Sequence, residues 1–198
     1  MKKSFREGVY VIVEVGIKLN KDLKYYDNML KQYGFKNDFT VDTYDIYYTN
    51  KNFDGMSENE IKNSCIRLRS CNDSKFVVQN KLLDDIDIKE ISSYDLDNFE
   101  DSLLKYGYKR IFDTKKKDYH YVKDGMSSKI QLQEIKDIGL LVYYDNPLYY
   151  DLPLEEQRKK LLDDLNLYGF NIKYDELGLD KLRTLYYKKE MFSKNQNG

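Results

Sequence analysis

The feature that most constrains this chain is a series of segments in which polar and apolar residues alternate. The clearest is 66–69, where Arg67 and Arg69 alternate with Ile66 and Leu68. Because successive side chains of a strand point to opposite faces of a sheet, this segment has one basic and one apolar face. Turn residues such as those at 72–74 predict antiparallel hairpins. The segments of strand composition are 9–18, 40–49, 63–70, 75–81, 108–121, 129–133 and 139–145.

Helical segments interrupt this series of strands. Three stretches of helical periodicity end in the order tyrosine, glycine, aromatic, at 33–35, 106–108 and 168–170. Glycine is the usual residue after the last helical turn because it adopts the left-handed conformation without strain. The order of helices and strands predicts an α+β fold. An antiparallel β-barrel with flanking helices would use this many strands without leaving open edges.

The positions of proline and glycine in the chain indicate a single domain. Its 198 residues contain two prolines, Pro147 and Pro153, and no linker rich in glycine or serine. We therefore expect one domain over 1–187, followed by a flexible tail over 188–198.

Composition excludes several kinds of site. The chain has one histidine, His120, so it cannot form a metal site from several histidines. We expect His120 to be an ordinary strand residue, and the alternative is that it contacts the substrate. Cys65 and Cys71 match neither a zinc site nor a disulfide scaffold. The longest apolar run, 9–13, is too short for a signal peptide or a membrane span. A cytoplasmic protein with reduced thiols and no membrane partner is expected.

The overall charge provides no general attraction for nucleic acid or membrane. Thirty-three basic residues stand against thirty-four acidic ones, which leaves a formal charge of −1. Any phosphate-binding surface must therefore be local. The lysine run at 115–117 has three interpretations: phosphate ligands, a solvated turn or a weak nucleic-acid patch.

Basic side chains recur on one face of successive strands. The residues assigned to this polar face are Lys18, Arg67, Arg69, Lys81, Lys115 and Lys117. Periodicity alone favours the plain interpretation, in which they form the solvated face of a half-buried sheet and bind nothing. In a barrel, however, the apolar face can pack under outer helices while the polar face lines the interior. Six cations in one lumen would repel one another strongly unless a polyanion lies among them.

The order of these residues resembles the CYTH family of triphosphate tunnel proteins, which includes class IV adenylate cyclases and thiamine triphosphatases. The first strand of that family carries Glu-x-Glu-x-Lys, and this chain has Glu14-Val-Gly-Ile-Lys18. The resemblance covers residues 9–177. Later motifs of the family are matched in order by 45–48 or 42–44, 66–69, 81, 115–117 and 132–145.

The resemblance implies a tunnel in which the six cations hold a triphosphate and carboxylates hold Mg²⁺ or Mn²⁺. Glu14 and Asp145 fall at metal-ligand positions of the family. Auxiliary site residues would be Gln133, Tyr143 and Tyr47. Three acidic positions of the family are replaced in this chain, by Gly16, Gln133 and Tyr143. Since uncharged side chains bind a hard divalent cation poorly, we expect a weakened or relocated metal site.

Two functions remain open at this point. The first is a metal-dependent phosphohydrolase or an enzyme similar to the class IV adenylate cyclases; the second is a module that binds a triphosphate or polyphosphate without turnover. The cyclases carry a His-Phe pair before the first glutamate, where this chain has Gly8 and Val9. This difference argues against cyclisation more than against binding or hydrolysis. The ligand, whether ATP, thiamine triphosphate or inorganic triphosphate, and the presence of a homodimer are not decided by the sequence.

Overall fold

The computed structural model describes residues 15–54, 56, 60, 64–72, 76–80, 90–91, 96–136 and 138–173. Glu14, Lys81 and the expected tail at 188–198 lie outside these residues. The described elements are β1 (Val15–Lys18), α1 (Leu23–Gln32), β2 (Lys36–Thr49), β3 (Cys65–Cys71), β4 (Phe76–Asn80), β5 (Glu90–Ile91), α3 (Leu96–Lys105), β6 (Lys109–Val122), β7 (Lys129–Ile135), β8 (Gly139–Asp145), the 3₁₀ turn η2 (Pro147–Tyr149) and α4 (Leu154–Leu167).

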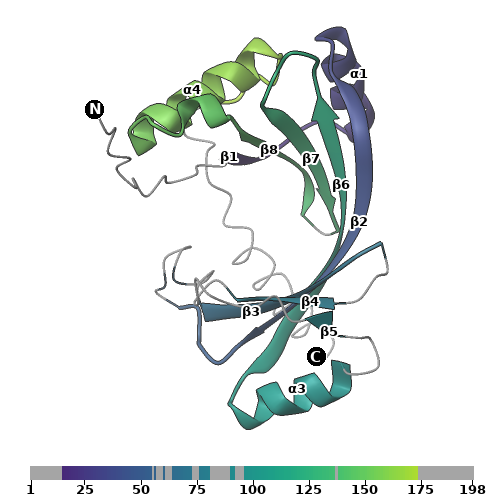
Figure 1. The fold of residues 1–198 in the computed structure, drawn as a ribbon, viewed down its shortest axis with the longest axis vertical. Coiled ribbons are helices and arrows are strands. Elements are labelled where there is room, and N and C mark those ends of the chain that lie inside the picture. The colour runs from purple at the N-terminus through teal and green to yellow at the C-terminus, as the bar shows by residue number, and fades with distance from the viewer. Residues whose placement is uncertain are drawn as a thin grey trace, which may run out of the picture.

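The strands form one eight-stranded antiparallel sheet in the order β1-β8-β7-β6-β2-β3-β4-β5. Figure 1 shows that this sheet is strongly curved and that the long strands β2 and β6 run through both of its halves. The α+β class and the antiparallel arrangement are confirmed. The expected closure of the barrel is not seen, because no pairing within the described part of the chain joins the edge strands β1 and β5.

The three Tyr-Gly-aromatic segments end helices as their sequence predicts. Gly34, Gly107 and Gly169 have φ angles of +83°, +79° and +87°, which lie in the left-handed region. In each case the aromatic residue that follows donates its backbone N–H to a carbonyl five residues earlier, as Phe35 does to Leu30 at 3.0 Å. These bonds satisfy the last carbonyls of α1, α3 and α4 and turn the chain into the next segment.

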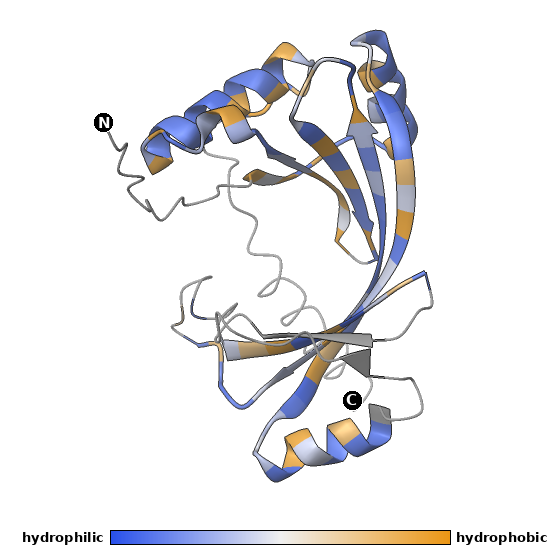
Figure 2. Cartoon of the chain, viewed as in Figure 1, coloured by the Kyte–Doolittle hydropathy of each residue, from blue (hydrophilic) through white to orange (hydrophobic). Residues whose placement is uncertain are grey.

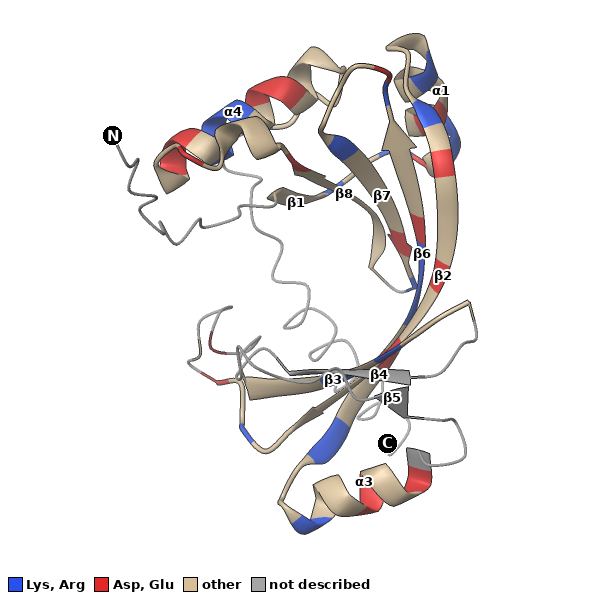
Figure 3. Ribbon diagram, viewed as in Figure 1, with Lys and Arg blue, Asp and Glu red and all other residues tan. Residues whose placement is uncertain are grey.

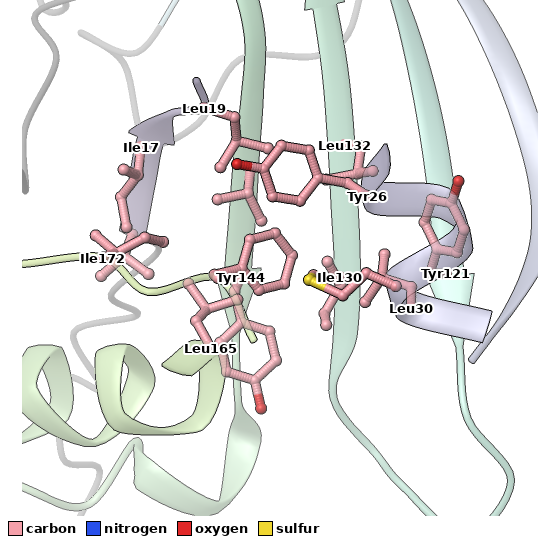
Figure 4. Packing of buried hydrophobic residues seen from close by; sticks show 14 of the residues in the cluster. Ile17, Leu19, Tyr26, Leu30, Tyr121, Ile130, Leu132, Tyr144, Leu165 and Ile172 are labelled. Atoms are coloured by element: carbon pink, nitrogen blue, oxygen red, sulfur yellow. The ribbon is translucent and has the colours of Figure 1, made fainter. Parts of the chain in front are cut away.

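Helices α1 and α4 cover the outer face of β1, β6, β7 and β8 (Figure 1). Figure 4 shows the apolar core between them, in which Tyr26 and Leu30 of α1 and Leu165 of α4 pack against strand residues such as Ile130 and Tyr144. All five side chains are buried. Figure 2 shows the corresponding alternation of apolar and polar positions along these strands. Burying one face under helices fixes which residues of each strand point the other way.

Helix α3 covers the outer face of the other half of the sheet. Leu103 packs there against Ile46 and Tyr48 of β2 and Leu68 of β3. The apolar face of β3 is therefore directed outward, under a helix, as expected for a barrel. No helix in the described part of the chain is long and apolar enough to cross a membrane.

The face of the sheet opposite these helices, called the inner face below, carries most of the residues singled out from the sequence. The strand register places on it Gly16, Lys18, Thr43, Asp45, Tyr47, Arg67, Arg69, Lys116, Asp118, Gln131, Gln133, Tyr143 and Asp145. The inner face is not entirely polar, because Tyr47, Phe112, Ile135 and Leu141 form a buried apolar cluster on it. Polar groups thus occupy defined parts of this face rather than all of it.

Candidate functional site

Four charged side chains meet on the inner face where β2, β3 and β6 lie side by side. Arg69 donates two hydrogen bonds to the Asp45 carboxylate, from Nε to Oδ1 at 2.7 Å and from Nη2 to Oδ2 at 2.8 Å. Lys116 donates from Nζ to Asp45 Oδ2, and Nη1 of Arg67 lies 4.0 Å from the same oxygen. We call Asp45, Arg67, Arg69 and Lys116 the Asp45 cluster. Charged positions concentrate along β2 and β6 in this region (Figure 3).

The Asp45 cluster has more positive than negative charge. Three cations and one carboxylate leave a formal charge of +2. The side chains of Asp45 and Lys116 are fully buried, whereas those of Arg67 and Arg69 are 23% and 26% exposed. Charges interact more strongly away from water, and the neighbouring carboxylate of Asp118 offsets this surplus only in part. The two arginines are the members of the cluster that a ligand can reach.

The protonation states follow from burial and charge. Burial opposes ionisation of Asp45, but the hydrogen bonds from Arg69 and the positive charges of Lys116 and Arg67 hold the pKa of its carboxyl well below the usual range. Burial lowers the pKa of Lys116 to about 8; attraction to Asp45 opposes this shift and repulsion from Arg69 adds to it. The cluster therefore contains a firmly ionised carboxylate and a lysine whose proton is only weakly held.

Two neighbours on the same face complete the surroundings of Asp45. The hydroxyl of Tyr47 donates to Asp45 Oδ2 at 3.2 Å, and burial raises the pKa of that hydroxyl. Thr114 lies directly across from Asp45 on β6, and its buried hydroxyl has no hydrogen-bond partner among the described residues. Tyr47 thus reaches the cluster as an uncharged donor.

A second carboxylate on the inner face, Asp118, is satisfied by uncharged donors. Gln131 donates to its Oδ1 at 2.9 Å, Gln133 donates to the same oxygen, and Thr43 donates to Oδ2 at 3.1 Å. Asp118 is buried and lies two residues after Lys116 on β6. Gln133 therefore donates a hydrogen bond to a carboxylate through its amide nitrogen. Asp118 is not among the site residues predicted from the sequence.

The positions at which the sequence resemblance places metal ligands have other contacts in this structure. Gly16 pairs with Tyr143 across β1 and β8, and a Cβ atom on Gly16 would lie 2.6 Å from Cε1 of the Tyr143 ring. The ring therefore covers the backbone where the family has two acidic side chains. Asp145 lies on the inner face but accepts a hydrogen bond from the hydroxyl of Tyr150 at 2.6 Å.

These residues do not fit a divalent metal ion. Mg²⁺ and Mn²⁺ require several oxygen ligands, of which carboxylates are the strongest. Among the residues that the structure describes, no group of three or more His, Cys, Asp or Glu side chains is placed to hold an ion. Glu14, the other predicted ligand, lies outside the described residues.

The predicted phosphate ligands divide into three groups. Lys18 lies on the inner face at the edge strand β1, where its side chain is exposed, and Arg67 and Arg69 belong to the Asp45 cluster. Lys81 lies outside the described residues. The remaining two, Lys115 and Lys117, are on the outer face, so the prediction that they share a face with Arg67 and Arg69 is wrong.

The register of β6 gives the physical reason for this correction. Lys116 pairs with Thr43 and shares the face of Asp45, so its two neighbours must point the other way. Lys115 Nζ lies 5.9 Å from the centre of the Tyr44 ring, and Lys117 Nζ lies 3.9 Å from Asp42 in a partly exposed pair. The middle lysine of the run, Lys116, is the inner one, and it shares its face with Asp118 two residues later.

Comparison with known proteins gives a likeness at the level of structure. No protein-family model matches the chain, and no curated protein matches it. A Pyrococcus horikoshii protein of solved structure matches with a TM-score of 0.57 and 17% identity, over 90% of this chain and 98% of its own. The likeness is one of fold.

Two further matches are to structures named "putative adenylate cyclase". The one from Vibrio parahaemolyticus has a TM-score of 0.52 and 18% identity, over 83% of this chain and 95% of its own. The one from Bacillus halodurans has a TM-score of 0.56 and 10% identity, over 89% and 97%. Each match covers nearly the whole length of the other chain, so the curved sheet and its helices are shared as one architecture.

Proposed function

We propose that this protein binds a small triphosphate on the inner face of its sheet, in the manner of the CYTH triphosphate tunnel proteins that its sequence resembles. The observation that carries the proposal is the formal charge of +2 in the Asp45 cluster, together with the partial exposure of its two arginines. A triphosphate supplies the negative charge that this cluster lacks. The fold likeness to structures named "putative adenylate cyclase" supports the same ligand class.

The contacts divide between the members of the cluster. Arginine has five N–H donors, and the two hydrogen bonds from Arg69 to Asp45 use two of them. Asp45 therefore fixes the plane of the Arg69 guanidinium while leaving an edge for phosphate oxygens. Arg67 lies beside it on the same strand face. Lys116 contributes charge from its buried position, and Lys18 is the expected contact from the opposite edge of the inner face.

Binding without turnover is the form of this function that the described residues favour. Hydrolysis or cyclisation in this family is expected to need a metal held by carboxylates, and Gly16 and Tyr143 fill that place with backbone and an aromatic ring. Gln133 is committed to Asp118. A metal-dependent phosphohydrolase or a cyclase-like enzyme is the second candidate, and the fold likeness is the observation in its favour.

The experiment measures binding and product formation in the same samples. Inorganic triphosphate, ATP and thiamine triphosphate are titrated calorimetrically with and without Mg²⁺ or Mn²⁺, and released phosphate and cyclic nucleotide are followed. We expect metal-independent binding and no product. Product formed by the wild type and lost in Glu14→Ala would instead establish the enzyme.

An Arg67→Glu variant tests the location of the site. Reversing this charge removes one contact and adds repulsion, so we expect triphosphate affinity to fall at least ~30-fold. The matched control is Arg158→Glu on α4, where the exposed Arg158 pairs with Glu155 at 2.9 Å away from the inner face. Unchanged affinity in Arg67→Glu would contradict the proposal.

A further inference from the structure

An aromatic pair on the inner face is not explained by phosphate binding. The rings of Phe39 and His120 stack with their centres 4.2 Å apart and their planes 17° apart. Phe39 is 44% exposed, and it is the one exposed large apolar residue of the described chain that lies on a strand; the others are on helices or turns. Burial lowers the pKa of His120, so its ring is neutral at pH 7. The pair thus presents an uncharged aromatic surface to solvent.

The strand register places this pair on the same face as the Asp45 cluster. Phe39 pairs with His120 across β2 and β6, and His120 follows Lys116 by four residues, an even number, so the two side chains share the inner face. Arg69, which a ligand can reach, pairs with Asp45, six residues from Phe39 on β2, and six residues of strand span about 20 Å. An extended nucleoside triphosphate and the long side chain of Arg69 together span this distance. Gln131 of β7 lies directly beside His120 and supplies a polar neighbour.

We propose that the Phe39–His120 pair is a stacking platform for the base of a nucleoside triphosphate whose phosphates lie at the Asp45 cluster. This inference rests on the proposed function and narrows its substrate class from small triphosphates in general to nucleotides. Any planar base can stack on an exposed aromatic ring, whichever hydrogen-bond donors and acceptors the base carries. The platform therefore favours ligands that contain a base but does not specify which base. Inorganic triphosphate has no group to place there.

A purely structural role for the pair predicts different behaviour. Cross-strand aromatic pairs stabilise antiparallel strands, so removing Phe39 on that interpretation lowers thermal stability and leaves ligand preference unchanged. The platform predicts that the change affects nucleotides alone. Comparing a nucleotide with inorganic triphosphate in the same variants therefore separates the two roles.

The first measurement is the affinity of the full chain for ATP and for inorganic triphosphate. We expect the wild type to bind ATP more tightly, and Phe39→Ala to weaken ATP binding roughly tenfold while changing inorganic triphosphate binding less than about twofold. The matched control is Tyr25→Ala on α1, where Tyr25 is 48% exposed, and it should change neither affinity. Equal losses for both ligands, or no loss for either, would overturn the platform.

The second measurement uses the absence of tryptophan from the sequence. Phe39→Trp places a single indole on the platform, and stacking of a base on it quenches its fluorescence. We expect ATP to quench this signal and inorganic triphosphate to leave it nearly unchanged, with no ATP effect in the control Tyr25→Trp. If the wild type binds inorganic triphosphate but ATP neither binds more tightly nor quenches the indole, the platform is wrong and the proposed function stands. If the wild type binds neither ligand, both are wrong.

Discussion

Asp45 is the residue whose replacement tests the electrostatic argument most directly. Its carboxylate accepts hydrogen bonds from Arg69, Lys116 and Tyr47, and its side chain is fully buried. Asp45→Asn keeps the shape of the side chain and removes its charge, which raises the formal charge of the cluster from +2 to +3. Removing one partner from a buried ion pair costs about 3–5 kcal/mol of the free energy of unfolding. We expect about 3 kcal/mol, because the asparagine oxygen still accepts from Arg69.

The loss depends on pH through Lys116. The pKa of this lysine is about 8 in the folded protein, below its ordinary value of 10.5, so between these values the unfolded chain binds the extra proton and stability rises with pH. Without Asp45 the pKa of Lys116 falls further, and the same rise begins at lower pH. The difference in the free energy of unfolding between wild type and Asp45→Asn is therefore larger at about pH 6 than at about pH 9.

Urea unfolding at the two pH values measures both quantities. The control is Asp124→Asn, which removes an exposed carboxylate paired with Lys36 at 3.0 Å and should cost less than about 1 kcal/mol at either pH. A loss in Asp45→Asn no greater than in this control would refute the argument that the carboxylate holds the cluster together. A large loss that is the same at both pH values would refute the assignment of a weakly held proton to Lys116.

Three further outcomes follow from the geometry. Calorimetry across the pH range should show the triphosphate affinity of the wild type falling as the pH rises through about 8, and Lys116→Met should bind more weakly at pH 7 and lose this dependence. The double change Lys115→Ala and Lys117→Ala should alter triphosphate affinity less than about twofold by the same method, because both lie on the outer face; a loss as large as that of a cluster residue would contradict the register. Gly16→Ala should lower the free energy of unfolding in urea by about 1–3 kcal/mol, and by less when Tyr143 is also replaced by alanine, since the new methyl group meets that ring.

The parts of this fold that the sequence predicts well are those set by local chemistry. The ends of α1, α3 and α4 depend on a glycine in the left-handed conformation, and each glycine is visible in the sequence. The faces of β3 are equally well determined, because Ile66 and Leu68 can be buried only on one side and Arg67 and Arg69 must then share the other.

The lysine run of β6 shows where such reasoning fails. In Lys115-Lys116-Lys117 either choice of face presents a basic residue, so alternation alone does not determine which lysine points inward. The face is decided by pairing with β2, which includes a register shift between Tyr47 and Tyr48. A shift of one residue reverses every side chain beyond it. The meeting of Asp45 with Arg69 has the same origin, since it depends on the register of two strands that are distant in sequence.

The different surroundings of Asp45 and Asp118 on the inner face determine the orientation in which a nucleotide can bind. Asp45 is surrounded by three cations, whereas the carboxylate of Asp118 is held by two amides and a hydroxyl. An anion is therefore attracted to the Asp45 end and repelled from Asp118, which lies between Lys116 and His120 on β6. A nucleotide can satisfy both only with its phosphates toward Arg67 and Arg69 and its uncharged part toward the aromatic pair. The charge distribution and the stacking surface thus require the same orientation of the ligand, although they arise from different residues.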